Sequence, residues 1–353
     1  MMNDKKQKTI NLALQGGGAH GAYAWGAIDR LLEDERIKID GICATSAGTM
    51  NACAVAYGMH LDGPKGAKEE LEKLWKNISA VGLLYNPVHN MPWEKPLSGI
   101  GDFSIGYFLF DAFTRMFSPY QTNPFDFNPL RQIMEKSIDF DVLHQCDCIK
   151  LFISTTQVRT GKVRVFDVHE INLDVVMASA CLPFLYKAVE IDGEYYWDGG
   201  YTGNPALFPL FYHTDTRDIL IMHINPLQRP ELPSTAPDII NRMNEISFNS
   251  PLLLEMRAIS FVKKLLRGNM LKEEYRSGFK DILIHSLRTD EAMCDLSVAS
   301  KFNTDWDFLT GLRDRGREAM SQWLEAHYDD LNVRDTVDLQ TDFLQSTQKK
   351  AAE

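Results

Sequence analysis

Residues 40–58, DGICATSAGTMNACAVAYG, decide how this chain folds. The sequence predicts a short buried strand over residues 41–44, an abrupt turn at 45–47, and a helix of small residues from position 48. Small residues on both sides of Ser46 allow the backbone to crowd into a tight strand-to-helix turn, as in the elbow motif G-x-S-x-G. Ala44 stands where that motif usually has its first glycine. The turn would expose the Ser46 hydroxyl beside the N-terminus of the following helix.

A second glycine-rich turn lies earlier in the chain. Residues 10–14 predict a strand, which is followed by QGGGAHG at 15–21 and then by a helix with apolar residues on one face. The spacing formally fits the dinucleotide motif G-x-G-x-x-G, with Asp40 as the acidic residue. However, Asp40 opens the strand that ends at Ser46, and neighbouring parallel strands end at the same edge of a sheet. We therefore expect the glycine loop to supply backbone N–H donors beside a nucleophilic serine.

The base that would serve Ser46 is less directly marked. A predicted hairpin over residues 189–197 leads into Asp198-Gly199-Gly200, where two glycines allow the carboxylate to approach another loop. A histidine base, in the order Ser, Asp, His, would be His223 or His285. His20, inside the glycine loop, is a further alternative. The early position of the serine, on the second predicted strand, argues against a histidine triad.

In combination, these motifs resemble the patatin-like phospholipase family. The matching segments are the glycine loop at 16–21, Thr45-Ser46-Ala47-Gly48, ASACLP at 178–183 and Asp198-Gly199-Gly200. The resemblance implies an α/β fold with three α/β/α layers, a mainly parallel central sheet, and a Ser46–Asp198 dyad without histidine. It further implies an oxyanion hole formed chiefly by Gly17 and Gly18, and no metal or cofactor. All residues expected to form the hole are Gly16, Gly17, Gly18, Ala19 and Ala47. The residues expected to shape the supporting loops are Gly21, Gly48, Gly199 and Gly200.

The sequence suggests three regions. A catalytic domain is predicted over residues 8–225, a mainly helical region over 226–339, and a disordered tail over 340–353. The helical region is expected to break at Pro251 into two helices. Residues 81–128 are rich in proline and aromatic side chains without a clean period, which fits an insertion packed on the core, a cap over an apolar channel or a lipid-contacting surface.

Composition restricts the partners. The net charge of −11 and the absence of a basic cluster argue against nucleic acid. No signal peptide or membrane-spanning run is evident, so we expect a cytoplasmic protein, with peripheral membrane contact left open. Cys146-Asp-Cys148 has no second pair with which to form a zinc site, and the six cysteines are expected to be reduced.

The predicted activity is hydrolysis of lipid acyl esters through an acyl-enzyme. The same dyad would also fit hydrolysis of a polyester or other acyl ester, or acyl transfer to another alcohol. A lipid-binding module with an idle dyad is the non-enzymatic alternative.

Overall fold

A mixed sheet forms the centre of the computed structural model, which describes residues 7–85 and 116–345 except 230, 294 and 297. Eight strands of the described residues pair in the order β5-β6-β3-β2-β1-β7-β8, with β4 also on β3. Strands β1, β2, β3, β7 and β8 are mutually parallel, whereas β4, β5 and β6 pair in antiparallel fashion. Their bounds are β1 Lys8–Leu14, β2 Ile37–Ala44, β3 Lys150–Gln157, β4 Val163–Asp167, β5 Val189–Ile191, β6 Glu194–Asp198, β7 Asp218–Met222 and β8 Leu283–Leu287.

Alternating side chains divide the interior into two cores, one on each face of the sheet. In β1, Leu12 and Leu14 enter the larger core, and Ala13 enters the smaller one. The same alternation places Leu220 in the first core and Ile221 in the second. Since successive side chains of a strand point to opposite faces, both faces of these central strands must be covered by helices.

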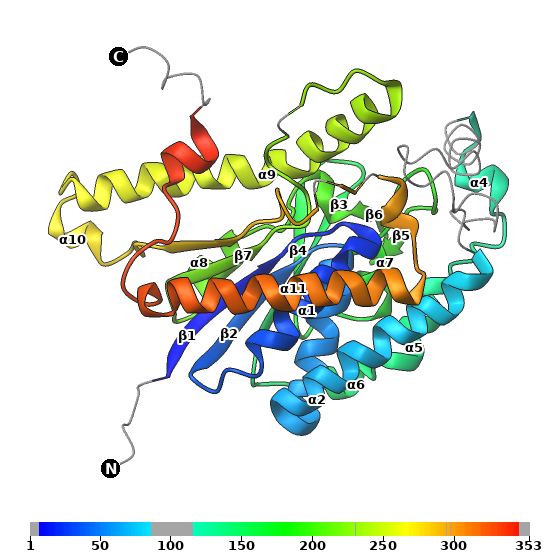
Figure 1. The fold of residues 1–353 in the computed structure, drawn as a ribbon, viewed down its shortest axis with the longest axis horizontal. Helices are drawn as coiled ribbons and strands as arrows, with labels where there is room; N and C mark the ends of the chain where they lie inside the picture. The colour runs from blue at the N-terminus through cyan, green and yellow to red at the C-terminus, as the bar shows by residue number, and fades with distance from the viewer. Residues whose placement is uncertain (1–6, 86–115, 230, 294, 297, 346–353) are drawn as a thin grey trace.

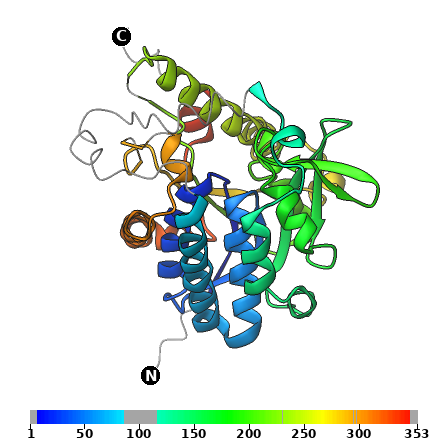
Figure 2. The same ribbon diagram turned by 90° about the vertical axis from the view of Figure 1, so that its right-hand side faces the viewer.

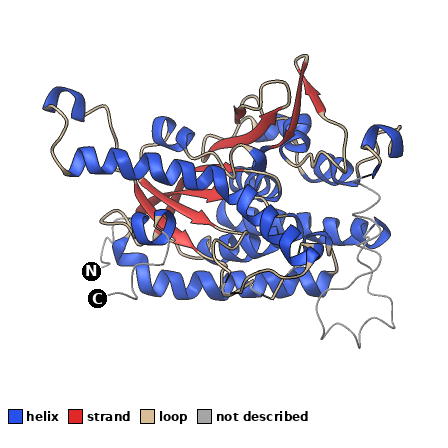
Figure 3. Ribbon diagram, turned by 90° about the horizontal axis from the view of Figure 1, so that it is seen from above, coloured by secondary structure: helices blue, strands red, loops and turns tan. Residues whose placement is uncertain are grey.

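Helices cover both faces. The larger core is packed by α1 (Gly21–Leu31), α2 (Ala47–Tyr85), α5 (Pro129–Ser137), α7 (Leu173–Ser179) and α11 (Trp306–His327), and the smaller core by α8 (Phe208–His213) and α9 (Ala236–Arg267). Figures 1 and 2 show α11 beside α1 and the long α9 on another side of the sheet. The remaining short helices are α4 Pro119–Thr122, α6 Phe140–Leu143, α10 Glu273–Arg276, the 3₁₀ turns Gly18–His20, Gly199–Tyr201, Ala299–Phe302 and Tyr328–Asp330, and the π turn Gln340–Leu344. The predicted three-layer fold is therefore confirmed (Figure 3).

Close backbone contact joins α1 to α11. A Cβ at Gly26 would lie 1.8 Å from the Arg313 carbonyl oxygen, and one at Gly316 would lie 2.0 Å from that of Tyr23. Glycine at both positions lets the two helices touch through their main chains. The C-terminal helix is therefore packed directly on the first helix of the glycine-loop unit.

Two expectations for the C-terminal region require correction. The predicted break at Pro251 does not occur, because α9 continues through it to Arg267. A proline inside a helix disturbs the hydrogen bonds of the carbonyls in the preceding turn. The Phe248 carbonyl lies in that turn, and it accepts a hydrogen bond of 3.2 Å from Asn204 Nδ2. In addition, Gln340–Leu344 is helical rather than disordered, since Phe343 is buried in the smaller core.

Much of the predicted insertion, residues 86–115, lies outside the described residues. Its last part, 116–128, exposes several apolar side chains, including Met116 and Phe125. Tyr120 accepts a hydrogen bond from the Ala188 amide, and Lys187 donates to the Pro124 carbonyl. Among the helices that the structure describes, none combines the length and apolar character needed to cross a bilayer.

Candidate functional site

The carboxyl ends of three central strands place the two glycine-rich turns next to one another. Leu14 of β1 pairs with Ala44 of β2 and with Met222 of β7. The loop after β1 and the elbow after β2 therefore start side by side at one edge of the sheet, as the sequence predicted.

Ser46 occupies the sharp turn between β2 and α2. Its φ of 55° lies in the left-handed region, which is uncommon and strained for a residue with a side chain. The Ser46 amide donates to Ser179 Oγ at 3.0 Å, and the Ser179 hydroxyl donates to the Ser154 carbonyl at 2.8 Å. Gly48 permits the tight turn, because a Cβ there would lie 2.4 Å from the Leu14 carbonyl oxygen. Ala44 is the last residue of β2 and is fully buried.

The glycine loop packs directly against this serine. A Cβ on Gly16 would lie 2.6 Å from Ser46 Cβ, and one on Gly21 would lie 2.8 Å from Ala47 Cβ. The Gly16 amide donates to Asn204 Oδ1 at 2.7 Å, so it is already occupied. Gly17 and Gly18 lead into the 3₁₀ turn, and the first amides of a helical turn lack intrahelical acceptors. Ala19 is buried within that turn, and Ala47 is the first residue of α2.

Asp198 ends β6 and is fully buried. Its Oδ1 accepts the Gly200 amide at 2.7 Å, and its backbone is fixed by the Cys181 carbonyl and the Thr156 hydroxyl. A Cβ on Gly199 would lie 2.2 Å from the Ser154 carbonyl oxygen, so β6 and β3 meet closely at this corner.

Burial raises the pKa of Asp198 to about 7, while the Gly200 amide, the Ser46 hydroxyl and the Lys301 cation act to lower it. No hydrogen bond of ordinary geometry reaches Asp198 Oδ2 from the described residues. The Ser46 hydroxyl is thus close enough to influence the pKa of Asp198, although no described hydrogen bond joins the two side chains. Catalytic hydrogen bonds are often long or poorly aligned before substrate binds.

Four buried amide side chains hold the glycine loop, and sequence reasoning missed all of them. Asn225 Nδ2 donates to the Gly16 carbonyl at 3.0 Å, opposite the Asn204 contact to the Gly16 amide. Gln15 accepts the amides of Ile224 and Asn225 and donates to Asn249 Oδ1 at 3.2 Å. Single amides scattered along the chain carry no local sequence signal, so only the fold reveals this network.

Lys301 connects the C-terminal region to the same loop. Its Nζ donates to Asn225 Oδ1 at 2.7 Å, and its carbonyl oxygen would lie 2.5 Å from a Cβ on Gly18. Gly18 has φ 59°, a conformation that favours glycine. Burial lowers the pKa of Lys301 to about 8, with Asp198 and Glu245 acting to raise it. The lysine is thus a cation close enough to influence the ionisation of Asp198.

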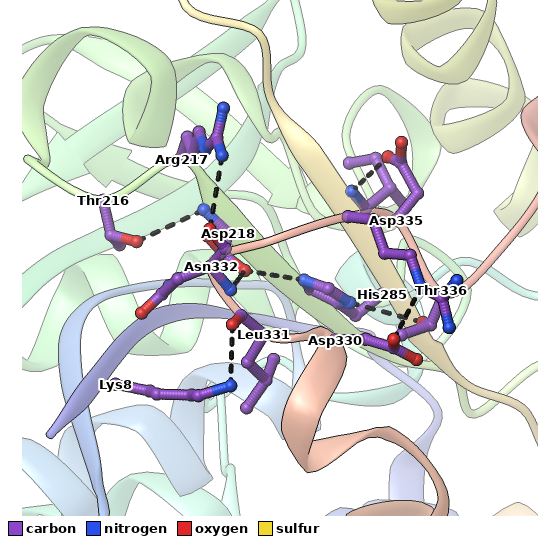
Figure 4. Close-up of polar contacts among 12 residues, drawn as sticks. Lys8, Thr216, Arg217, Asp218, His285, Asp330, Leu331, Asn332, Asp335 and Thr336 are labelled. Carbon is purple, nitrogen blue, oxygen red and sulfur yellow. Dashed lines mark hydrogen bonds and ion pairs between the residues drawn. The ribbon is translucent and has the colours of Figure 1, made fainter. Parts of the chain in front are cut away.

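The candidate histidine bases have other neighbours. Figure 4 shows His285 pointing to Asp218, with its Nε2 2.9 Å from Asp218 Oδ1. Asp218 begins β7, at the opposite end of the sheet from Ser46. Burial lowers the pKa of His223 to about 4, and its ring lies against Phe343. His20 Nε2 lies 2.7 Å from Ser300 Oγ.

A family model matches more than half of the chain. The family model for patatin-like phospholipases matches residues 12–211, which include Ser46, Asp198 and the glycine loop. No curated protein matches the sequence significantly.

Two solved structures are similar over most of the chain. VipD from Legionella pneumophila is 14% identical with a TM-score of 0.44, and the alignment covers 96% of this chain and 73% of VipD. A structure of SpcU in complex with ExoU, from the type III secretion system of Pseudomonas aeruginosa, is 15% identical with a TM-score of 0.31. That alignment covers 91% of this chain and 53% of the other, so this chain spans about half the length of that neighbour.

Proposed function

Because this chain belongs to the patatin-like phospholipase family, we propose that it hydrolyses lipid esters with Ser46 as nucleophile and Asp198 as base. The observation that carries the proposal is the strained Ser46 beside the glycine loop, with its hydroxyl near the buried Asp198 carboxyl. Patatin-like phospholipases act on lipid substrates, and the apolar side chains exposed over 116–127 give this chain a surface suited to such a substrate.

In the proposed reaction, ionised Asp198 accepts the Ser46 proton as the serine oxygen attacks the ester carbonyl. The amides of Gly17, Gly18 and Ala47 stabilise the oxyanion, and one such donor is typically worth about 3 kcal/mol. Collapse of the tetrahedral intermediate expels the alcohol, which takes the proton from Asp198. Asp198 then activates a water molecule to release the acid from the acyl-enzyme. The raised pKa makes Asp198 a better base than an exposed carboxylate.

The direct test compares acid release from phospholipid vesicles and from a soluble short-chain ester. Ser46→Ala is expected to reduce turnover of both by at least about 10³-fold, because it removes the nucleophile. Asp198→Asn is expected to do the same, because an amide does not accept the proton. Asp192→Asn is a matched control, since Asp192 is exposed in the β5–β6 turn and asparagine tolerates its φ of 52°.

The outcomes separate the alternatives. Near wild-type turnover in Ser46→Ala would contradict the proposal. Loss of turnover in His223→Leu, with turnover retained in Asp198→Asn, would restore a histidine base. Serine-dependent turnover of the soluble ester alone would indicate a different acyl ester, and acyl transfer to an added alcohol would indicate a transferase. A folded wild type that fails to react with a fluorophosphonate would indicate an idle dyad.

A further inference from the structure

The Cys146-Asp-Cys148 segment brings two sulfur atoms unusually close together. It lies between α6 and β3, and the two Sγ atoms are 2.6 Å apart. This separation is only moderately longer than the ~2.05 Å of a disulfide bond. The two thiols therefore need little movement to bond to one another.

The surroundings favour a thiolate at Cys146. Contact with the Cys148 thiol lowers the pKa of Cys146, and the backbone of Cys148 and Ile149 acts in the same direction, against the opposing effect of burial. His60, from α2, also acts to lower it. Because the thiolate is the nucleophilic form of cysteine, these interactions prepare Cys146 for reaction.

The two cysteines also differ in access. Cys148 is exposed, whereas Cys146 is largely buried beside it. The other described cysteines, Cys43, Cys53 and Cys181, are buried, and burial raises the pKa of each. Among the residues with described positions, no third His, Cys, Asp or Glu joins this pair as a metal ligand set. The pair is thus chemically distinct from the other described thiols.

We propose that Cys146 and Cys148 form a redox-active dithiol that is oxidised to an intramolecular disulfide by small-molecule disulfides such as oxidised glutathione. The exposed Cys148, as its thiolate, attacks one sulfur of the small disulfide, forming a mixed disulfide and releasing one glutathione thiolate. The neighbouring Cys146 thiolate then attacks the Cys148 sulfur and releases the second. Two protein thiols lose two electrons, one small disulfide gains them, and the two protons end on the released thiols. Exposed disulfides are typically reducible, so the reaction is expected to be reversible.

This site is separate from the proposed hydrolase site. The segment precedes β3, whose N-terminal Lys150 pairs with Gly41 of β2, whereas Ser46 follows the other end of β2. The two centres therefore lie at opposite ends of the sheet, and the redox proposal does not depend on lipid hydrolysis.

The test treats the reduced full-length protein with oxidised glutathione and follows it by intact mass and non-reducing peptide mapping. The wild type is expected to lose two hydrogen atoms and to yield a Cys146–Cys148 cross-linked peptide, which dithiothreitol reverses. Cys146→Ser is expected to accumulate one glutathione on Cys148, because the resolving thiol is absent. Cys148→Ser is expected to form its adduct at least tenfold more slowly, because the remaining thiol is buried. Circular dichroism before treatment checks that each variant is folded.

Wild-type protein that retains both thiols under these conditions would overturn the proposal. So would a persistent glutathione adduct without the cross-link, or equal rates of adduct formation in the two serine variants. The wild-type peptide map alone shows whether both thiols are retained and whether a glutathione adduct persists without the cross-link.

Discussion

At the scale of single residues, the proposed catalytic role of Asp198 has a cost in stability. A carboxyl group free in water ionises near pH 3.8, whereas burial raises the pKa of Asp198 to about 7. Between these pH values the folded chain keeps a proton that the unfolded chain has lost. The contribution of Asp198 to the free energy of unfolding is therefore complete below pH 3.8 and is lost as the pH rises to about 7.

We accordingly expect Asp198→Asn to be inactive and, at pH 8, more stable than the wild type. The gain is at most about 4 kcal/mol, since the pKa rises from 3.8 to about 7 and each tenfold change in an ionisation constant corresponds to ~1.36 kcal/mol. Urea unfolding at pH 8 and pH 4.5 measures this. The advantage should be small at the lower pH, and an equal advantage at both values would contradict the explanation. Asp192→Asn should show no such dependence.

The candidate functional residues that the sequence predicted are those with a local signal. Ser46 stands between small residues, Asp198 precedes two glycines, and the order of these motifs matches a known family. The meeting of Ser46 with the glycine loop was also predictable, because parallel strands end at one edge of the sheet. The place of Asp198 was not predictable in this way, because β6 runs antiparallel to β3. In contrast, Asn225 and Lys301 carry no motif, and their positions depend on how distant segments pack.

At the scale of helices and strands, α9 and the turn holding Lys301 complete the glycine loop from outside residues 12–211. Asn249, on α9, donates to the carbonyls of Asn225 and Pro226 at 3.3 and 3.0 Å. Asn225 in turn contacts the Gly16 carbonyl and receives Lys301 Nζ. The C-terminal region thus fixes the orientation of backbone amides that the proposed mechanism requires.

We expect Asn225→Ala to lower kcat by about 10- to 100-fold with a small change in KM, because the loop loses one of its two Gly16 anchors. This corresponds to about 1.4–2.7 kcal/mol of lost transition-state stabilisation. Initial rates normalised to the folded fraction give both constants. A change confined to KM would instead assign Asn225 to substrate binding.

Lys301→Met should shift the ionisation of Asp198 in a defined direction. The Lys301 cation lowers the pKa of Asp198, so its removal should move the acidic limb of the kcat/KM profile to higher pH. Lys264→Met is a matched control, because it removes a positive charge from the exposed surface of α9. Lys264 has no described contact with Asp198, Lys301 or the glycine loop. An unchanged limb in Lys301→Met would show that the cation does not act on Asp198.

The predicted break at Pro251 was wrong for a reason that belongs to this scale. Helix propensity is local, but Leu252, Met256 and Ile259 continue one buried face after the proline. The Asn204 side-chain amide also donates a hydrogen bond to the Phe248 carbonyl, in the turn before the proline. Tertiary burial and one long-range hydrogen bond therefore outweigh the local penalty.

At the scale of the whole molecule, contacts at the end of the sheet opposite Ser46 join β1 and β7 to the segment that follows α11. Lys8 Nζ donates to the carbonyls of Tyr328, Asp329 and Leu331. Asp218 Oδ1 accepts the Asn332 amide at 2.6 Å as well as the His285 ring (Figure 4). These contacts span between 67 and 323 positions, so no window of sequence could predict them.

This arrangement supports a structural role for His285 over the catalytic one that the sequence left open. We expect Asp218→Ala to lower the free energy of unfolding by about 2–4 kcal/mol, because it leaves the buried His285 ring and the Asn332 amide without their shared acceptor. Urea unfolding measures the loss. Asp215→Ala is a matched control, since the Asp215 side chain is 98% exposed and should change the same free energy by less than about 0.5 kcal/mol.

Activity separates this role from catalysis. Since Asp218 and His285 lie at the far end of the sheet, the fraction of Asp218→Ala that remains folded should keep the wild-type kcat and the wild-type pH profile. Titration of active sites with a fluorophosphonate gives that fraction. A kcat reduced about 10³-fold per titrated site, with stability unchanged, would place the His285–Asp218 pair in the reaction and contradict the assignment of Asp198 as the base.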